Sequence, residues 1–154
     1  MNRSYYLGAA IDLSSDLNPF DVMSSKVIEL DPECIIFRPD KAYNNAHKAS
    51  VTNAFYLKSV NDHALLEADT AIFYISSKIF SMGAALEIQA RAQMHERCSL
   101  EEIEHDQGKK TIVITDKAGL YLKIQHSDDL LVYVEDSKPL AEIDFEVLLN
   151  TVHK

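Results

Sequence analysis

The segment that decides the fold is Asp69–Ile75, which reads DTAIFYI. Its side chains are apolar on both faces of the run, a pattern typical of a strand buried in a parallel sheet. After a loop, the stretch Met82–Arg97 is rich in alanine and other strong helix formers. A buried strand followed by a helix is half of a βαβ unit, so this segment predicts a parallel sheet covered by helices.

The same alternation repeats on both sides of this segment. Further short apolar runs predict strands at Ser4–Ile11, Glu33–Arg38, Lys110–Thr115 and Leu130–Val134. Helical patterns lie at Pro19–Leu30, Val51–Ala68 and Pro139–Val152, and Ser99 with Glu102 fits a capping box that would open a short helical turn over Leu100–Asp106. We therefore expect a single α/β domain over residues 1–154: a Rossmann-like or flavodoxin-like doubly wound sheet of about five parallel strands with flanking helices.

Composition narrows the partners and the compartment. The chain has 154 residues, 47% of them hydrophobic, which is enough for one domain with its own core. A net charge of −9 disfavours binding to nucleic acid polymers or anionic membranes. No apolar run could span a bilayer, and the N-terminus lacks a signal-peptide layout. The two cysteines, Cys34 and Cys98, are too few for a disulfide framework, so we expect a cytoplasmic protein.

A ligand site is expected where the strands end, because open parallel sheets bind ligands outside the carboxyl ends of their strands. The informative segment there is Ser76–Glu87. Ser81 can cap the following helix, and Gly83 with its neighbouring alanines leaves space near the backbone. Glu87 lies on the same helix face as Gly83, near a helix N-terminus whose dipole favours an ionised carboxylate. Such a carboxylate could attack an anomeric carbon, although a glutamate early in a helix is also common for the dipole alone.

Other chemistries find little support in the sequence. There is no Gly-x-Gly-x-x-Gly or Walker pattern, which disfavours nicotinamide cofactors and P-loop nucleotide hydrolysis. His95 and Cys98 could form half of a zinc site, but no second pair completes it. No Gly-x-Ser-x-Gly elbow is present. We expect neither a metal nor a cofactor.

The stretch Asn61–Ala92, NDHALLEADTAIFYISSKIFSMGAALEIQARA, resembles the core of the nucleoside 2-deoxyribosyltransferase family. That family has an Ala-Asp pair opening a buried strand and Gly-x-x-x-Glu on the next helix, which here are Ala68-Asp69 and Gly83 with Glu87. The run Tyr5–Ile11, YYLGAAI, resembles the first strand of the family and its turn. The resemblance covers about half of the chain well.

The resemblance implies cleavage or exchange of the N-glycosidic bond of a 2′-deoxynucleoside, without a cofactor. Glu87 would attack C1′ to give a glycosyl-enzyme, and Tyr6 would hydrogen-bond Glu87 and hold its orientation. Water or a second base would complete the reaction, and the choice between them is left open, as is the base preference. The substrate would lie against the end of the first strand and the start of the helix, at Gly8, Ala9, Ile11, Ser81 and Gly83.

This chain departs from the family at the expected acid. Many members carry Asp eight residues before the strand-opening Asp, where this chain has Asn61. Asparagine cannot supply a proton, whereas the adjacent Asp62 could if the helix turned it inward. Neighbours on a helix are about 100° apart, so both cannot face the cleft equally, and the identity of the acid stays open. Asn61 also favours an alternative function, a non-catalytic nucleotide-binding protein that keeps the fold. Another nucleotide-processing enzyme is a third alternative.

Ser81 bears on whether the substrate carries a phosphate. Family members that act on free nucleosides often have Asp six residues before the nucleophile, and the branch that hydrolyses nucleoside 5′-monophosphates has Ser there. Serine can bond a phosphate that an aspartate would repel. That branch often has Arg after the first strand, where Asp12 stands here, so Lys78 or Arg38 would have to supply the positive charge.

The loop after the second strand and the quaternary structure complete the expectations. Pro39 and Asp40 set a turn, and Tyr43 or Phe37 could stack on a base, or else Phe37 belongs to the core and Tyr43 packs the loop.

The resemblance also implies a homodimer or higher homo-oligomer in which a neighbouring subunit helps to close the pocket. The expected partner is a small-molecule nucleoside or nucleotide.

Overall fold

The computed structural model of the chain describes residues 2–10, 18–42, 54–76, 81–101, 108–116 and 129–153. Within these ranges, five strands form one sheet in the order β2-β1-β3-β4-β5, and every neighbouring pair is parallel. The strands are β1 (Ser4–Ala9), β2 (Ile35–Phe37), β3 (Thr70–Ile75), β4 (Lys110–Thr115) and β5 (Leu130–Val134). This confirms the expected doubly wound parallel sheet, with the strand order of flavodoxin-like folds.

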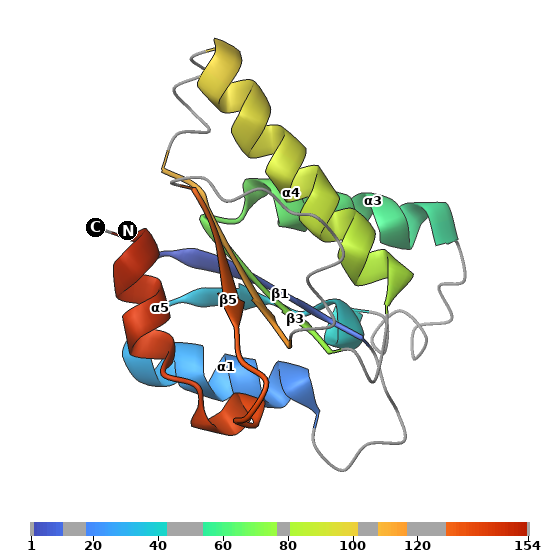
Figure 1. The fold of residues 1–154 in the computed structure, drawn as a ribbon. Helices are drawn as coiled ribbons and strands as arrows, with labels where there is room; N and C mark the ends of the chain where they lie inside the picture. The colour runs from blue at the N-terminus through green and yellow to red at the C-terminus, as the bar shows by residue number, and fades with distance from the viewer. Residues whose placement is uncertain are drawn as a thin grey trace.

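Helices cover both faces of the sheet (Figure 1). One face carries α1 (Pro19–Leu30) and α5 (Phe145–Val152), and the other carries α3 (Ala54–Glu67) and α4 (Met82–Glu101). Alternate strand residues point to opposite faces, so each strand supplies both cores and reads as a continuous apolar run. In β1, for example, Tyr5 packs on the α1 and α5 side and Tyr6 on the α3 and α4 side. None of the helices in the described ranges is both long and apolar enough to cross a membrane.

The predicted element bounds hold where start and stop signals are strong. Helix α1 begins at Pro19 because Asn18 caps it, its side-chain oxygen accepting from the backbone N–H of Phe20 at 2.9 Å. The predicted capping box at Ser99 is wrong, because α4 continues through Ser99 to Glu101. No glycine or proline interrupts the helix formers there, so nothing in the sequence ends the helix earlier.

The predicted single helix over residues 139–152 is also wrong. The segment forms a 3₁₀ turn, η3 (Leu140–Glu142), and α5 starts only after Asp144. The Asp144 side chain accepts from the backbone N–H of Val147 at 3.3 Å and so caps the start of α5. The break lets both Leu140 and Ile143 bury their side chains in the core beneath α1 and α5.

The edge where the strands begin is fixed by polar contacts. The Asp69 carboxylate accepts from the backbone N–H and the hydroxyl of Ser4 at 2.8 and 3.1 Å, and the Asp69 N–H donates to the Ser4 hydroxyl at 3.0 Å. Thr70 Oγ1 lies 3.0 Å from His153 Nε2. These contacts join the starts of β1 and β3 to the end of α5. Asp69 of the Ala68-Asp69 pair therefore has a structural role at the amino-terminal edge of the strands, opposite the edge where a ligand site is expected.

A fully buried arginine anchors α4 to the sheet. The Arg91 guanidinium donates to the backbone carbonyls of Leu65, Ala68 and Lys110 and to the hydroxyl of Thr111, at 2.6–3.1 Å. His95, one turn further on, lies 2.8 Å from the same hydroxyl. Burial, together with the charge of Arg91, lowers the pKa of His95 to about 4, so its ring is neutral at pH 7. These hydrogen bonds fix the position of α4, which carries Glu87, relative to β3 and β4.

Candidate functional site

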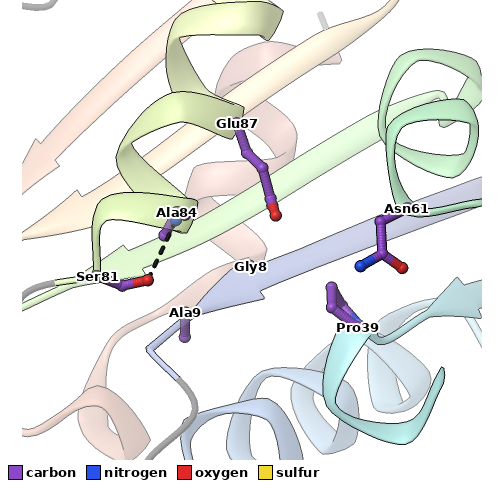
Figure 2. A pocket seen from close by; sticks show the side chains of 8 residues that line it. Gly8, Ala9, Pro39, Asn61, Ser81, Ala84 and Glu87 are labelled. Atoms are coloured by element: carbon purple, nitrogen blue, oxygen red, sulfur yellow. Dashed lines mark hydrogen bonds between the residues drawn. The ribbon is translucent and has the colours of Figure 1, made fainter. Parts of the chain in front are cut away.

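The site lies where the connections from neighbouring strands part. Strands β1 and β3 are paired, but α1 follows β1 on one face of the sheet and α4 follows β3 on the other. Such a switch point leaves a crevice outside the carboxyl ends of the strands. A pocket of about 350 Å³ opens there (Figure 2). It is lined by Gly8, Ala9, Pro39, Asn61, Ser81, Gly83, Ala84 and Glu87.

Glu87 points from α4 into this pocket (Figure 2) and is held by Tyr6. The Tyr6 hydroxyl donates to Glu87 Oε2 at 2.8 Å, which is the contact implied by the resemblance. The Tyr6 ring is fully buried and stacks on Phe37 with a centroid separation of 5.6 Å. Phe37 therefore belongs to the core, and its packing fixes the ring that orients Glu87.

Burial opposes the ionised form of Glu87 that the helix dipole was expected to favour. Burial raises the pKa of Glu87 to about 7. The negative charge of Asp62 also raises this pKa, whereas the hydrogen bond from Tyr6 and the positive charge of Lys58 lower it. Glu87 lies in the second turn of α4, where the dipole has weakened. The same burial and the nearby Glu87 raise the pKa of Tyr6, so Tyr6 stays a donor. A carboxyl with a pKa near neutrality can serve as nucleophile, base or acid.

The two glycines of the pocket differ in the space around them. A Cβ on Gly8 would lie 2.3 Å from the ring of Phe73, so close packing between β1 and β3 excludes any side chain there. Among the described residues, a Cβ on Gly83 would meet only the Ser81 hydroxyl, at 3.8 Å. Ser81 caps α4 as expected, its Oγ accepting from the Ala84 N–H at 3.2 Å (Figure 2). The start of α4 therefore leaves space on the pocket side.

Of the two neighbouring positions on α3, Asn61 lines the pocket and Asp62 does not. Asn61 reaches from α3 toward the space opposite Glu87 (Figure 2), and its Oδ1 is buried with no hydrogen-bond partner among the described residues. Asp62 is not one of the residues that line the pocket, its side chain is 47% exposed, and its Oδ2 lies 2.6 Å from Lys58 Nζ. Asp62 thus acts on Glu87 only through its charge.

Arg38 does not reach the pocket either. Its Nε and Nη2 donate to the two Asp40 oxygens at 3.1 and 2.7 Å, and its Nη1 lies 2.8 Å from Asp21 Oδ1. Burial alone would raise the pKa of Asp40, but the hydrogen bonds and charge of Arg38 outweigh it and lower the pKa. Arg38 is thus paired with two aspartates outside the pocket lining, and its charge ties the end of β2 to the start of α1.

The structure gathers Gly8, Ala9, Asn61, Ser81, Gly83 and Glu87 from the expected site, with Tyr6 behind Glu87. Ile11, Tyr43 and Lys78 lie outside the described residues. Pro39 and Ala84 also line the pocket. Pro39 follows the end of β2, and Ala84 lies one helical turn before Glu87, so the strand-end rule and helical spacing could have identified both.

In the described part of the chain, no three His, Cys, Asp or Glu side chains are grouped so that they could hold a metal ion. No protein-family model matches this chain, and no curated protein matches it.

Proposed function

We propose that the protein cleaves or exchanges the N-glycosidic bond of a 2′-deoxynucleoside or its 5′-monophosphate, with Glu87 as the nucleophile. The observation that carries the proposal is the Glu87 carboxyl, which faces a pocket at the switch point of the sheet and accepts a 2.8 Å hydrogen bond from a buried tyrosine. The resemblance of Asn61–Ala92 to the nucleoside 2-deoxyribosyltransferases supports the same reading.

The chemistry follows the retaining pattern of glycosidases. Tyr6 engages Oε2 of Glu87, which leaves Oε1 for attack on C1′ of the sugar. The C1′–N bond breaks as the C1′–O bond forms, and the bonding electrons leave with the base. Water or a second base then attacks C1′, and the Glu87 carboxylate is released. Tyr6 acts by keeping the carboxyl in one orientation, which preserves the geometry of attack.

Two substrate forms remain, and different residues favour each. The hydroxyl of Ser81 and the start of the 20-residue helix α4 can bond a phosphate. Against a phosphate, none of the described residues that line the pocket is cationic, and Arg38 is held by two aspartates. Both forms belong in the first assay.

The test is the release of free base, followed by chromatography. The protein is incubated with each common 2′-deoxynucleoside and each 5′-monophosphate, with and without a second base. Glu87→Ala is compared with Glu96→Ala, which removes an exposed glutamate from the same helix. We expect base release by the wild type and by Glu96→Ala and none by Glu87→Ala. Equal activity of the wild type and Glu87→Ala would exclude Glu87 as the nucleophile.

A second candidate function is nucleotide binding without catalysis. It is favoured by Asn61, an amide that stands in the pocket where a proton donor is expected. Calorimetric titration with the same compounds separates the two candidates. Binding without base release, at high protein concentration and with every substrate form, would favour the binding protein.

A further inference from the structure

One of the described residues that line the pocket can exchange a proton near neutral pH. Among the described lining residues, Glu87 is the only side chain that titrates, and the others come from glycine, alanine, proline, serine and asparagine. Glycosidic cleavage usually employs two carboxyls, one of which protonates the leaving group. A serine hydroxyl and an asparagine amide donate hydrogen bonds but do not give up their protons at this pH.

The position opposite Glu87 is occupied by a neutral amide. Figure 2 shows the Asn61 nitrogen turned toward the space between Glu87 and Pro39, and its oxygen turned away. That oxygen is buried without a partner among the described residues, so no described group dictates how the amide is rotated. The adjacent carboxyl of Asp62 is paired with Lys58 outside the pocket lining. In the orientation of Figure 2, the group that Asn61 presents to the pocket from α3 is an N–H donor.

We propose that the substrates of this pocket are nucleosides whose base leaves as a stabilised anion, and that Asn61 donates a hydrogen bond to a carbonyl oxygen of that base. The inference rests on the proposed glycosidic function and narrows its substrate class to 2,4-dioxopyrimidine deoxynucleosides or their monophosphates. In these bases a carbonyl flanks the glycosidic nitrogen, and negative charge spreads onto two oxygens. Adenine has no carbonyl, so its departure depends more on protonation of a ring nitrogen.

The step balances without an acid from the protein. Ionised Glu87 forms the C1′–O bond, the C1′–N bond breaks, and the negative charge moves from the carboxylate to the base. The Asn61 N–H bonds more strongly to the carbonyl oxygen as that charge develops, which stabilises the transition state more than the ground state. After departure the base anion takes its proton from water.

The first experiment measures how the rate depends on the acidity of the base. The wild type is assayed with 5-substituted 2′-deoxyuridines of graded base acidity and with 2′-deoxyadenosine, in the form, free or 5′-phosphorylated, that the base-release assay selects. We expect kcat/KM to rise steeply with the acidity of the leaving base and to be about 100-fold lower for the adenine substrate, the usual contribution of a missing general acid. A flat dependence and equal cleavage of adenine would overturn the inference.

The second experiment changes the two neighbouring positions on α3. Asn61→Asp places a carboxyl where the amide stands, and should flatten the dependence on base acidity and raise kcat/KM for the adenine substrate relative to 2′-deoxyuridine by about 10-fold or more. Asp62→Asn is the matched comparison and should leave the slope unchanged. A selective loss of adenine cleavage in Asp62→Asn would identify Asp62 as the acid and overturn the inference.

Two further controls keep the outcomes distinct. Circular dichroism establishes whether each variant folds. If Asn61→Asp does not fold, the dependence of wild-type kcat/KM on base acidity still tests the inference. If cleavage requires Glu87 but its rate does not depend on base acidity, the inference is wrong and the proposed function is still supported. No cleavage of even the most acidic base would overturn both.

Discussion

The hydroxyl of Tyr6 on β1 donates to the carboxyl of Glu87 on α4 at 2.8 Å, across a separation of 81 residues in the sequence. Along the chain, α1, β2, α3 and β3 lie between strand β1 and helix α4. The orientation of the Glu87 carboxyl therefore depends on how distant segments of the chain pack together on the α3 and α4 face.

Tyr6→Phe should slow turnover by about 10-fold, the loss of one hydrogen bond to a charged group at ~1.5 kcal/mol. Because this hydrogen bond lowers the pKa of Glu87, its loss should also move the acidic limb of the pH–rate profile to higher pH. Tyr5→Phe is the matched control, since Tyr5 donates to Asp31 at 3.2 Å on the opposite face. The control should keep both the rate and the profile of the wild type.

The pH–rate profile should identify the working form of Glu87. Burial raises the pKa of Glu87 to about 7, and only the ionised carboxylate attacks carbon. We expect kcat/KM to increase with pH through about 7 and then to level off. A profile that decreases through the same pH would mean that Glu87 works in its protonated form, as an acid.

Glu87 should lower the stability of the fold as the pH rises. Its pKa is raised from 4.5 to about 7 by burial, so the folded state binds more protons than the unfolded state between these values, and the free energy of unfolding falls across that window. Glu87→Gln removes this term and should be more stable than the wild type by up to about 3 kcal/mol at a pH above 7. Below the unfolded pKa the two proteins should be nearly equal.

Urea unfolding of both proteins at two pH values measures this difference. Other titrating groups, such as the buried His95, contribute equally to both proteins and cancel. A constant difference between wild type and Glu87→Gln at all pH values would show that the carboxyl is not desolvated in solution.

The two pocket glycines should respond differently to alanine. Gly8→Ala forces a methyl group against the Phe73 ring, where the Cβ would lie 2.3 Å from the nearest ring atom, and should destabilise the fold by about 1–3 kcal/mol. Gly83→Ala meets open space and should leave stability unchanged or raise it by up to about 1 kcal/mol, because alanine favours helix. Thermal unfolding separates the two, and equal destabilisation by both would contradict the packing at Gly8.

Local signals explain how much of the fold is visible in the sequence. The bounds of α1, β4 and β5 are as predicted, because Asn18 and Pro19 open the helix and the two strands are compact β-branched and aliphatic runs. The C-terminal segment fails because Asp144 can lie within a helix or cap one, and the choice depends on burial of Leu140 and Ile143 by distant elements. Spacing alone carries no such information.

The site shows the same division. The strand-end rule and helical spacing bring Gly8, Ser81, Gly83 and Glu87 to one pocket. The pairing of Arg38 with Asp21 and Asp40 could not be foreseen, because it depends on how α1 approaches the end of β2. The pKa of Glu87 likewise depends on burial that only the packed structure defines.

Arg91 follows Glu87 by one helical turn and bonds to carbonyls and a hydroxyl around the starts of β3 and β4. The spacing between Arg91 and Glu87 along α4 therefore sets where the Glu87 carboxyl lies in the pocket. Inserting or deleting one residue between them would rotate Glu87 by about 100° relative to Arg91 and turn it out of the pocket. A change of length in this turn should therefore abolish base release while every side chain of the pocket is still present.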